Sequence, residues 1–240
     1  MFNRFLSVDD ADRAFNVFRK LAGHEIGQWA ITGGFAAEIH LLRLGRQASI
    51  RALNDLDFIA GSFDRIPETL ASDFLFRHIH PAASHSKTMV QFVDRDSALR
   101  IDVFRASGTT LNRKFPLRLS SGTIHVVSLE DLVARAARQA LDLAEGVPVA
   151  LKHATDFLRL VELADPALME PAWQDHRKLK HPLAFVEARR LLQYLIPAHP
   201  ELLITPLFSH DTGEVCPRCL ATPAFRLADP KLIFALLGYC

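Results

Sequence analysis

Two carboxylates lie one residue apart in the apolar stretch ALNDLDFIAG, residues 52–61. The stretch has the composition of a β-strand, in which residues i and i+2 point to the same face. Asp55 and Asp57 are therefore expected side by side, which is costly unless something positive lies between them. Paired carboxylate oxygens are the hard ligands that Mg²⁺ takes, with substrate phosphates completing its coordination. The alternative is a solvent-facing pair on an edge strand, which the apolar neighbours of the two aspartates argue against.

A third carboxylate, Asp102, lies in the apolar stretch ALRIDVFRA, residues 98–106. A carboxylate from a neighbouring strand would complete the ligand set of two metal ions about 4 Å apart. It could also accept the proton of an attacking hydroxyl group, as a general base does. The alternative that stays open is a carboxylate neutralised by a nearby arginine, such as Arg100 or Arg105.

The pair Gly33-Gly34 lies between a strand-like segment, residues 27–32, and a helix-like segment, residues 35–45. Glycine lets the backbone approach a ligand closely, and the first turn of a helix offers unpaired N–H groups and the positive end of its dipole. This arrangement predicts a phosphate site. The alternative is a tight strand-to-helix turn with no ligand, since short glycine motifs are common.

The elements that must position these residues follow from the hydrophobic pattern. Ser7 and Asp10 have the spacing of a capping box at the start of a first helix, and Gly45 is expected to end a second one. Pro67 is expected near the first turn of a third helix. Helices are predicted over 7–23, 35–45 and 64–74, and strands over 27–34, 55–61, 122–127 and, joined by a turn at DRDS, over 87–106.

From Ser128 onward the pattern changes to successive helices, over 128–146, 148–164 and 181–196 with others between or after them. The predicted fold class is therefore α/β (α+β): a mixed sheet flanked by helices over residues 1–128, then a helical domain over 129–205. A short Cys-containing tail is expected over 206–240.

Composition restricts the class of protein. Apolar residues make up 49% and charged residues 23% of the 240 residues, as in an ordinary globular protein. The net charge of +1 gives no global attraction to nucleic acid or membrane, and no apolar run reaches the roughly 18 residues of a membrane span. The N-terminus lacks the apolar core of a secretory signal. The 3 cysteines fit a reducing cytosol better than a disulfide framework, so a cytoplasmic location is expected.

Taken together, the segments ITGGFAAEIH, RALNDLDFIAG and LRIDVF resemble the nucleotidyltransferase superfamily, which has the fold of DNA polymerase β. In that superfamily a Gly-Gly or Gly-Ser turn opens a helix, a D-x-D strand follows, and a third Asp lies on a later strand. The resemblance covers about residues 25–130. The Gly-Gly form, with an arginine shortly before the D-x-D, is most similar to the minimal branch, which includes antibiotic nucleotidyltransferases and AbiEii-type toxins of toxin–antitoxin systems.

The resemblance implies a Mg²⁺-dependent transfer of a nucleoside monophosphate from an NTP, such as ATP, to an acceptor hydroxyl, with release of pyrophosphate. It implies that Asp55 and Asp57 hold Mg²⁺ against the triphosphate, and that Asp102 binds a second metal and activates the acceptor. Gly33 and Gly34 would contact the phosphates. Polymerase-like members often have Ser at the position of Gly34, which leans away from that branch.

Two basic residues, Arg51 and Lys152, are expected to bind the nucleotide at this site. Arg51 is the arginine expected to reach phosphate with its bidentate fork, whereas a solvated connector explains Arg43 and Arg46 equally well. Lys152 lies on a predicted helix comparable to one that carries a nucleotide-facing lysine in minimal nucleotidyltransferases. An i,i+4 pair of Lys152 with Asp156 is the structural alternative.

The tail contains Cys216 and Cys219 in a CPRC motif, the spacing of a zinc knuckle. A structural Zn²⁺ site needs four ligands, and His210 and Cys240 are candidates for the other two. The alternative is two reduced cysteines at a turn.

The sequence leaves the acceptor open among a small molecule, a tRNA end and a protein hydroxyl. An antitoxin or a second copy of the chain is a possible partner, and a membrane is not expected. The alternative function is a non-catalytic nucleotide-binding or interaction protein with a nucleotidyltransferase fold.

Overall fold

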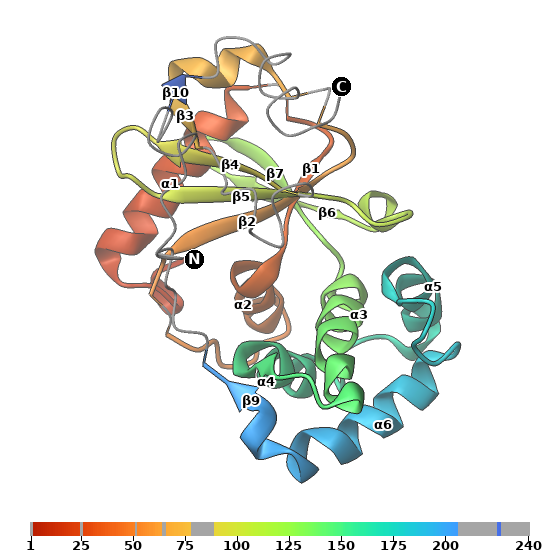
Figure 1. The fold of residues 1–240 in the computed structure, drawn as a ribbon. Helices are drawn as coiled ribbons and strands as arrows, with labels where there is room; N and C mark the ends of the chain where they lie inside the picture. The colour runs from red at the N-terminus through yellow and green to blue at the C-terminus, as the bar shows by residue number, and fades with distance from the viewer. Residues whose placement is uncertain are drawn as a thin grey trace, which may run out of the picture. The chain divides into compact units, whose positions relative to one another are not determined.

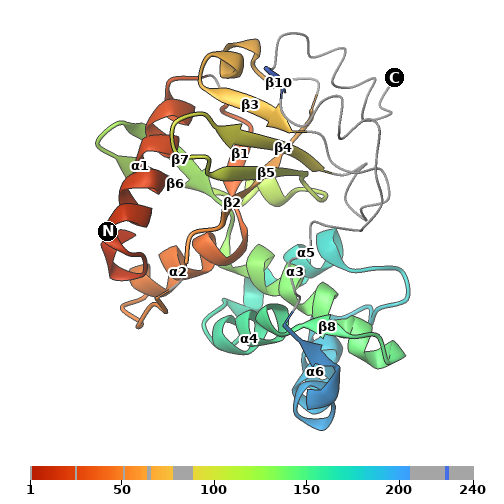
Figure 2. The ribbon, with the colours of Figure 1, turned by 60° about the vertical axis from the view of Figure 1, so that its left-hand side comes forward.

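The structure is a computed structural model, and it describes residues 2–24, 26–50, 52–63, 66–77, 89–205 and 225–226. The chain forms two compact units (Figures 1 and 2). The first contains Met1–Ala106, Lys114–Val126 and Gly213–Cys240, and the second contains Ser107–Arg113 and Val127–Thr212. The segment between the two strands that end at Arg105 and begin at Phe115 therefore belongs to the second unit.

The first unit is built on an eight-stranded sheet with the order β10-β3-β4-β5-β2-β1-β7-β6. The β2–β5 and β1–β7 pairs are parallel and the other pairs are antiparallel, so the predicted mixed sheet is confirmed. The strand that carries Asp55 and Asp57 lies between two others and is not an edge. The strands are β1 (Trp29–Ile31), β2 (Asp55–Ala60), β3 (Phe74–Arg77), β4 (Met89–Asp94), β5 (Arg100–Arg105), β6 (Phe115–Leu119), β7 (Gly122–Val126) and β10 (Phe225–Arg226).

Helix α1 (Val8–Ala22) lies along one face of this sheet (Figure 1). It begins as predicted, because Ser7 Oγ accepts the N–H of Asp10 at 3.1 Å. The ring of Phe18 packs edge-on against Phe58 of β2, and Lys20 Nζ lies 2.5 Å from Asp94 Oδ1 of β4. Apolar residues on this face of the strands therefore form the core under α1.

Helix α2 (Gly33–Arg43) begins two residues after β1 ends. Gly45 ends it as predicted: Gly45 has φ +66°, just after the C-cap Leu44, and Arg46 N–H bonds to Leu41 O at 2.8 Å. The helix expected over residues 64–74 is shorter than predicted, a 3₁₀ helix over Glu68–Ser72 that starts after Pro67. Strands β3, β6 and β10 were not predicted, since they are only four, five and two residues long.

The second unit is helical, as predicted. It consists of α3 (Leu129–Ala140), α4 (Leu151–Leu160), α5 (Pro166–His176) and α6 (Phe185–Ala198), with a small parallel pair of β8 (Val149–Ala150) and β9 (Leu203–Ile204). Short 3₁₀ helices are η1 (Phe2–Arg4) in the first unit and η3 (Thr110–Asn112), η4 (Leu141–Glu145) and η5 (Pro200–Leu202) in the second. The helix predicted from Pro148 begins three residues later, because Val149 and Ala150 pair with β9. Trp173 and Phe157 are fully buried in its core.

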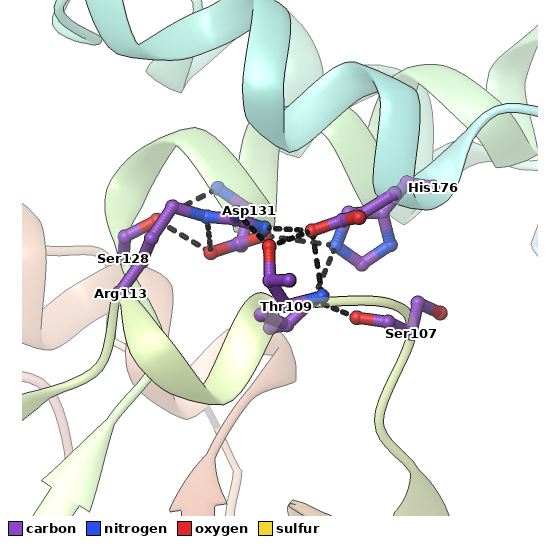
Figure 3. A network of polar contacts seen from close by, with 8 residues as sticks. Ser107, Thr109, Arg113, Ser128, Asp131 and His176 are labelled. Carbon is purple, nitrogen blue, oxygen red and sulfur yellow. Dashed lines mark hydrogen bonds and ion pairs between the residues drawn. The ribbon is translucent and has the colours of Figure 1, made fainter.

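A buried carboxylate organises one end of the second unit (Figure 3). Asp131 of α3 accepts hydrogen bonds from Arg113 Nε at 3.0 Å and Nη2 at 2.7 Å, and from Ser128 Oγ at 2.7 Å. His176 Nε2 of α5 lies 3.1 Å from the same carboxylate. Burial raises the pKa of Asp131, but the bonds from His176, Arg113 and Ser128 outweigh it and lower the pKa to about 2.

The same network holds the segment Ser107–Arg113. Asp175 of α5 accepts the N–H of Thr109 at 2.9 Å, its hydroxyl at 2.7 Å and Arg113 Nη2 at 2.6 Å. Gly108 has φ +46°, and a Cβ there would lie 2.0 Å from Asp175 Oδ1, so only glycine fits this turn. The segment is therefore fixed to α3 and α5 by charge-assisted hydrogen bonds.

Among the residues that the structure describes, every helix is too short or too polar to span a bilayer.

Candidate functional site

The three predicted carboxylates lie on one face of two adjacent central strands. Asp57 of β2 and Asp102 of β5 are direct cross-strand partners, and Asp55 is the partner of Arg100 two residues earlier. Residues i and i+2 share a face, so Asp55, Asp57 and Asp102 point to the side of the sheet opposite Phe58 and α1. The sequence predicted both the shared face and the neighbouring strand.

Gly33 lies against Asp57. Thr32 N–H bonds to Asp57 O at 2.9 Å, which brings the start of α2 beside this strand. Gly33 has φ +68°, and a Cβ at Gly33 would lie only 2.1 Å from Asp57 Oδ2. The glycine therefore lets the first turn of α2, which also contains Gly34, approach the carboxylate.

Asp102 is held by two partners on the sheet. Gln91 of β4, its cross-strand partner on the other side, donates from Nε2 to Asp102 Oδ1 at 2.6 Å. Arg100 Nε lies 3.2 Å from Asp102 Oδ2. Asp102 is only 6% exposed, so its orientation is fixed by these contacts.

Arg100 also joins Asp102 to Asp55, because its Nη2 forms an ion pair with Asp55 Oδ2. Arg100 is thus a positive partner of Asp55 and of Asp102 in this structure. Arg100 was foreseen only as an alternative partner of Asp102. Two carboxylates that bind one guanidinium are necessarily neighbours.

The donor set suits a hard divalent cation, because it consists of carboxylate oxygens from adjacent strands beside a glycine cradle that a Cβ would fill. Asp55, Asp57 and Asp102 are the residues that would hold such an ion. Within the described part of the chain, no group of three His, Cys, Asp or Glu side chains converges closely enough to ligate a metal as it stands. Arg100 accounts for this at two of the three carboxylates, since it bridges Asp55 and Asp102.

The predicted basic residues are placed differently. Arg51 lies outside the described residues. Arg43 stacks over the ring of Phe115 of β6, with its guanidinium carbon 3.8 Å from the ring centroid, so a structural role explains it. Arg46 is exposed.

Lys152 is exposed on α4 of the second unit. Its neighbour His153 is in a basic environment: burial, Lys152 and Arg135 lower the pKa of His153 to about 4. Asp156 lies 3.8 Å from Arg159 on the same helix. The nucleotide-facing role of Lys152 stays a prediction, as does its alternative pairing with Asp156.

The tail ligands Cys216, Cys219, His210 and Cys240 lie outside the described residues, and the zinc site stays a prediction.

Sequence reasoning missed Gln91 and the Asp131 network. Gln91 is the one polar residue inside the strand MVQFV, but a symmetric hairpin about the DRDS turn would place it opposite Arg100. The observed register is shifted by two residues and pairs Gln91 with Asp102. Either register puts Gln91 on the same face as Asp102, and this shared face is the only signal that the sequence contains. Asp131 and Arg113 are 18 residues apart, with two strands between them, and no spacing in the sequence announces their contact.

No protein-family model matches the chain, and no curated protein sequence matches it. Among solved structures, the chain is similar to an antigenic nucleotidyltransferase-like protein from Paracoccidioides brasiliensis, with 15% identity and a TM-score of 0.42 over 82% of this chain and 92% of that one. It is similar to the Megavirus polyadenylate synthase, with 13% identity and a TM-score of 0.39 over 82% of this chain and 43% of that one. It is also similar to JHP933 from Helicobacter pylori, with 14% identity and a TM-score of 0.29 over 82% of this chain and 97% of that one. The chain thus spans less than half of the polyadenylate synthase, and likenesses this distant leave the chemistry to be argued from the residues.

Proposed function

We propose that the chain is a Mg²⁺-dependent nucleotidyltransferase that moves a nucleoside monophosphate from an NTP to an acceptor hydroxyl. One observation carries this proposal: Asp57 and Asp102 are register partners on two adjacent parallel strands. Asp55 lies on the same face, and Gly33 packs against Asp57. Folding alone does not require three acidic side chains at the middle of a sheet, where charge is costly. A reaction that binds metal ions and phosphate does require such acidic side chains.

In this proposal Asp55 and Asp57 would hold Mg²⁺, and Asp102 would bind a second ion and accept the proton of the acceptor hydroxyl. The acceptor oxygen would bond to the α-phosphorus of the NTP, and pyrophosphate would leave. The bound cations would supply neutralisation of the phosphate charge. The N–H groups of the first turn of α2, at Gly33 and Gly34, would donate to phosphate oxygens. Gln91 keeps Asp102 in one orientation.

The finer features are proposed with the same activity. Arg51 and Lys152 would bind the nucleotide phosphates, where lysine acts as a point charge and arginine as a fork. The protein would resemble the minimal, AbiEii-like or antibiotic-modifying branch, act in the cytoplasm, and have an antitoxin or a second copy as partner. The near-zero net charge favours a small molecule or protein hydroxyl over a large nucleic-acid acceptor.

A second function is favoured by a specific observation. Arg100 pairs with both Asp55 and Asp102, so two of the three carboxylates already share a positive partner without a metal. This arrangement suits a non-catalytic nucleotide-binding or interaction protein in which the acids are structural.

A transfer assay separates the two functions. The protein would be incubated with each α-labelled NTP and Mg²⁺, and separately with total RNA, cell protein and an antibiotic panel. Asp57→Asn is the test variant, and Asp96→Asn is the matched control, because Asp96 is exposed on a turn of the same unit. Label that enters one acceptor class with the wild type and Asp96→Asn, and falls at least about 100-fold in Asp57→Asn, supports the transferase. NTP binding without label in any acceptor supports the interaction protein instead.

A further inference from the structure

Arg100 occupies the position of a counter-ion in the carboxylate cluster. It lies on β5 directly opposite Asp55 of β2 and two residues before Asp102, so all three side chains share one face. Its Nη2 pairs with Asp55 Oδ2 and its Nε lies 3.2 Å from Asp102 Oδ2. The arginine side chain is only 16% exposed, that of Asp102 8% and that of Asp55 31%. The guanidinium thus lies between the two carboxylates and is shielded from solvent mainly on the side of Asp102.

The two carboxylate oxygens that lie nearest the guanidinium are oxygens that a divalent cation would need. A carboxylate oxygen turned toward a guanidinium is not turned toward a metal, and two positive charges at one place repel strongly where solvent is excluded. This agrees with the lack of a ready three-ligand group among the residues described.

We propose that Arg100 is a built-in competitor of the divalent cation: metal binding at Asp55 and Asp102 requires the guanidinium to leave, and the site is closed to metal while Arg100 is in place. That the ion would act in nucleotide transfer rests on the proposed function. The competition between Arg100 and the ion does not depend on it. In the absence of metal, the guanidinium would offset part of the negative charge of the acidic cluster and keep Asp55 and Asp102 ordered. It would also set the metal concentration at which the site opens.

The control for this idea lies on the same strand. Arg105 is exposed at the other end of β5 and, five residues from Arg100, points to the opposite face of the sheet. Arg105→Gln and Arg100→Gln each remove one positive charge from β5, so they change the overall field alike. Only Arg100→Gln removes the guanidinium from the carboxylates.

The test measures binding of Mn²⁺ alone to the full-length protein, by the electron paramagnetic resonance signal of the free ion. Mn²⁺ prefers the same oxygen ligands as Mg²⁺. We expect Arg100→Gln to bind Mn²⁺ at least about tenfold more tightly than the wild type, a change equivalent to about 1.4 kcal/mol. Arg105→Gln should stay within about twofold of the wild type, since exposed charges contribute little. Adding Asp57→Asn to Arg100→Gln should remove the gain.

Equal affinity in Arg100→Gln and Arg105→Gln would overturn the proposal, and so would the absence of Mn²⁺ binding in every variant. If Arg100→Gln does not fold, as judged by its thermal unfolding, Arg100→Lys replaces it. A lysine is a single point charge that cannot bridge two carboxylates as the planar fork does, so a smaller gain of about threefold is expected. No gain in Arg100→Lys would count against the competition.

These results are separable from the transfer assay. Tighter Mn²⁺ binding in Arg100→Gln without any nucleotide transfer would uphold the competition and defeat the proposed transferase. Nucleotide transfer by the wild type, together with an unchanged Mn²⁺ affinity in Arg100→Gln, would support the transferase and overturn the competition.

Discussion

The carboxylate of Asp57 fills the space that a side chain at Gly33 would need, because a Cβ at Gly33 would lie 2.1 Å from Asp57 Oδ2. This contact couples the first turn of α2 to the D-x-D strand. It ties a backbone feature, the glycine turn, to one of the proposed metal ligands.

Gly33→Ala tests this coupling, with Gly45→Ala as its matched control. Both glycines have a left-handed backbone, with φ +68° and +66°, but nothing lies within 4 Å of a Cβ at Gly45. Gly45→Ala should lower the free energy of unfolding by about 1 kcal/mol through backbone strain alone. Gly33→Ala should cost about 1–3 kcal/mol more, because Asp57 has to move. Urea unfolding measures both, and equal losses would show that the contact with Asp57 is unimportant.

Gln91→Leu should destabilise the protein through Asp102. A buried carboxylate that loses its donor pays a desolvation cost of about 1–3 kcal/mol. In an Asp102→Asn background the same substitution should cost clearly less, since a neutral amide is cheaper to leave unpaired. A double-mutant cycle from urea unfolding gives this coupling energy. Additive losses would mean that Gln91 stabilises the sheet by packing and not through the carboxylate.

The pH dependence of stability should report Asp131. Its pKa is lowered to about 2, so its contribution is present above the ordinary carboxyl pKa near 4 and is lost as the pH falls from about 4 to about 2. One pKa unit corresponds to about 1.4 kcal/mol, which makes the contribution about 2 kcal/mol. The free energy of unfolding, measured in urea between pH 5 and pH 2, should therefore fall more steeply for the wild type than for Asp131→Asn. Parallel curves for the two proteins would contradict the network.

His153 should also make the protein less stable as the pH falls, but at a milder pH than Asp131 does. Its pKa is lowered to about 4 by burial, Lys152 and Arg135, so the unfolded chain takes up a proton before the folded one does. Stability that is full above about pH 6.5 should fall by about 1–3 kcal/mol as the pH drops to about 4. His153→Gln should flatten this part of the profile. A profile between pH 7 and pH 4 that the substitution leaves unchanged would place His153 in a solvated environment.

The elements around the proposed site could be predicted because their signals are local. The apolar alternation around Asp55 and Asp57 specifies a strand, Ser7 and Gly45 mark helix ends, and the DRDS turn fixes a hairpin. The shared face of the two aspartates then follows from the period of a strand.

The rest depends on partners that are distant in sequence. Predicting the contacts of Arg100 would require knowing that β2 and β5 are adjacent and which residues of the two strands are paired. A strand pattern alone does not specify this. Strands β3 and β6 are only four and five residues long, too short to show a clear alternation, and each is paired with a neighbouring strand. The short 3₁₀ segment after Pro67 lacks the apolar face that would extend it into a full helix.

The Arg113–Asp131 pair has a consequence for dividing the chain. Arg113 precedes β6 and Asp131 follows β7, so the helical unit takes a guanidinium from a segment that lies before two strands of the sheet. A fragment that starts at residue 127 would contain all four long helices but neither Arg113 nor Thr109. Asp131 would then be buried without its guanidinium, a loss that costs about 3–5 kcal/mol when one partner of a buried pair is removed. The two halves are therefore interleaved along the chain, and a viable truncation or domain exchange has to carry residues 107–113 with the helices.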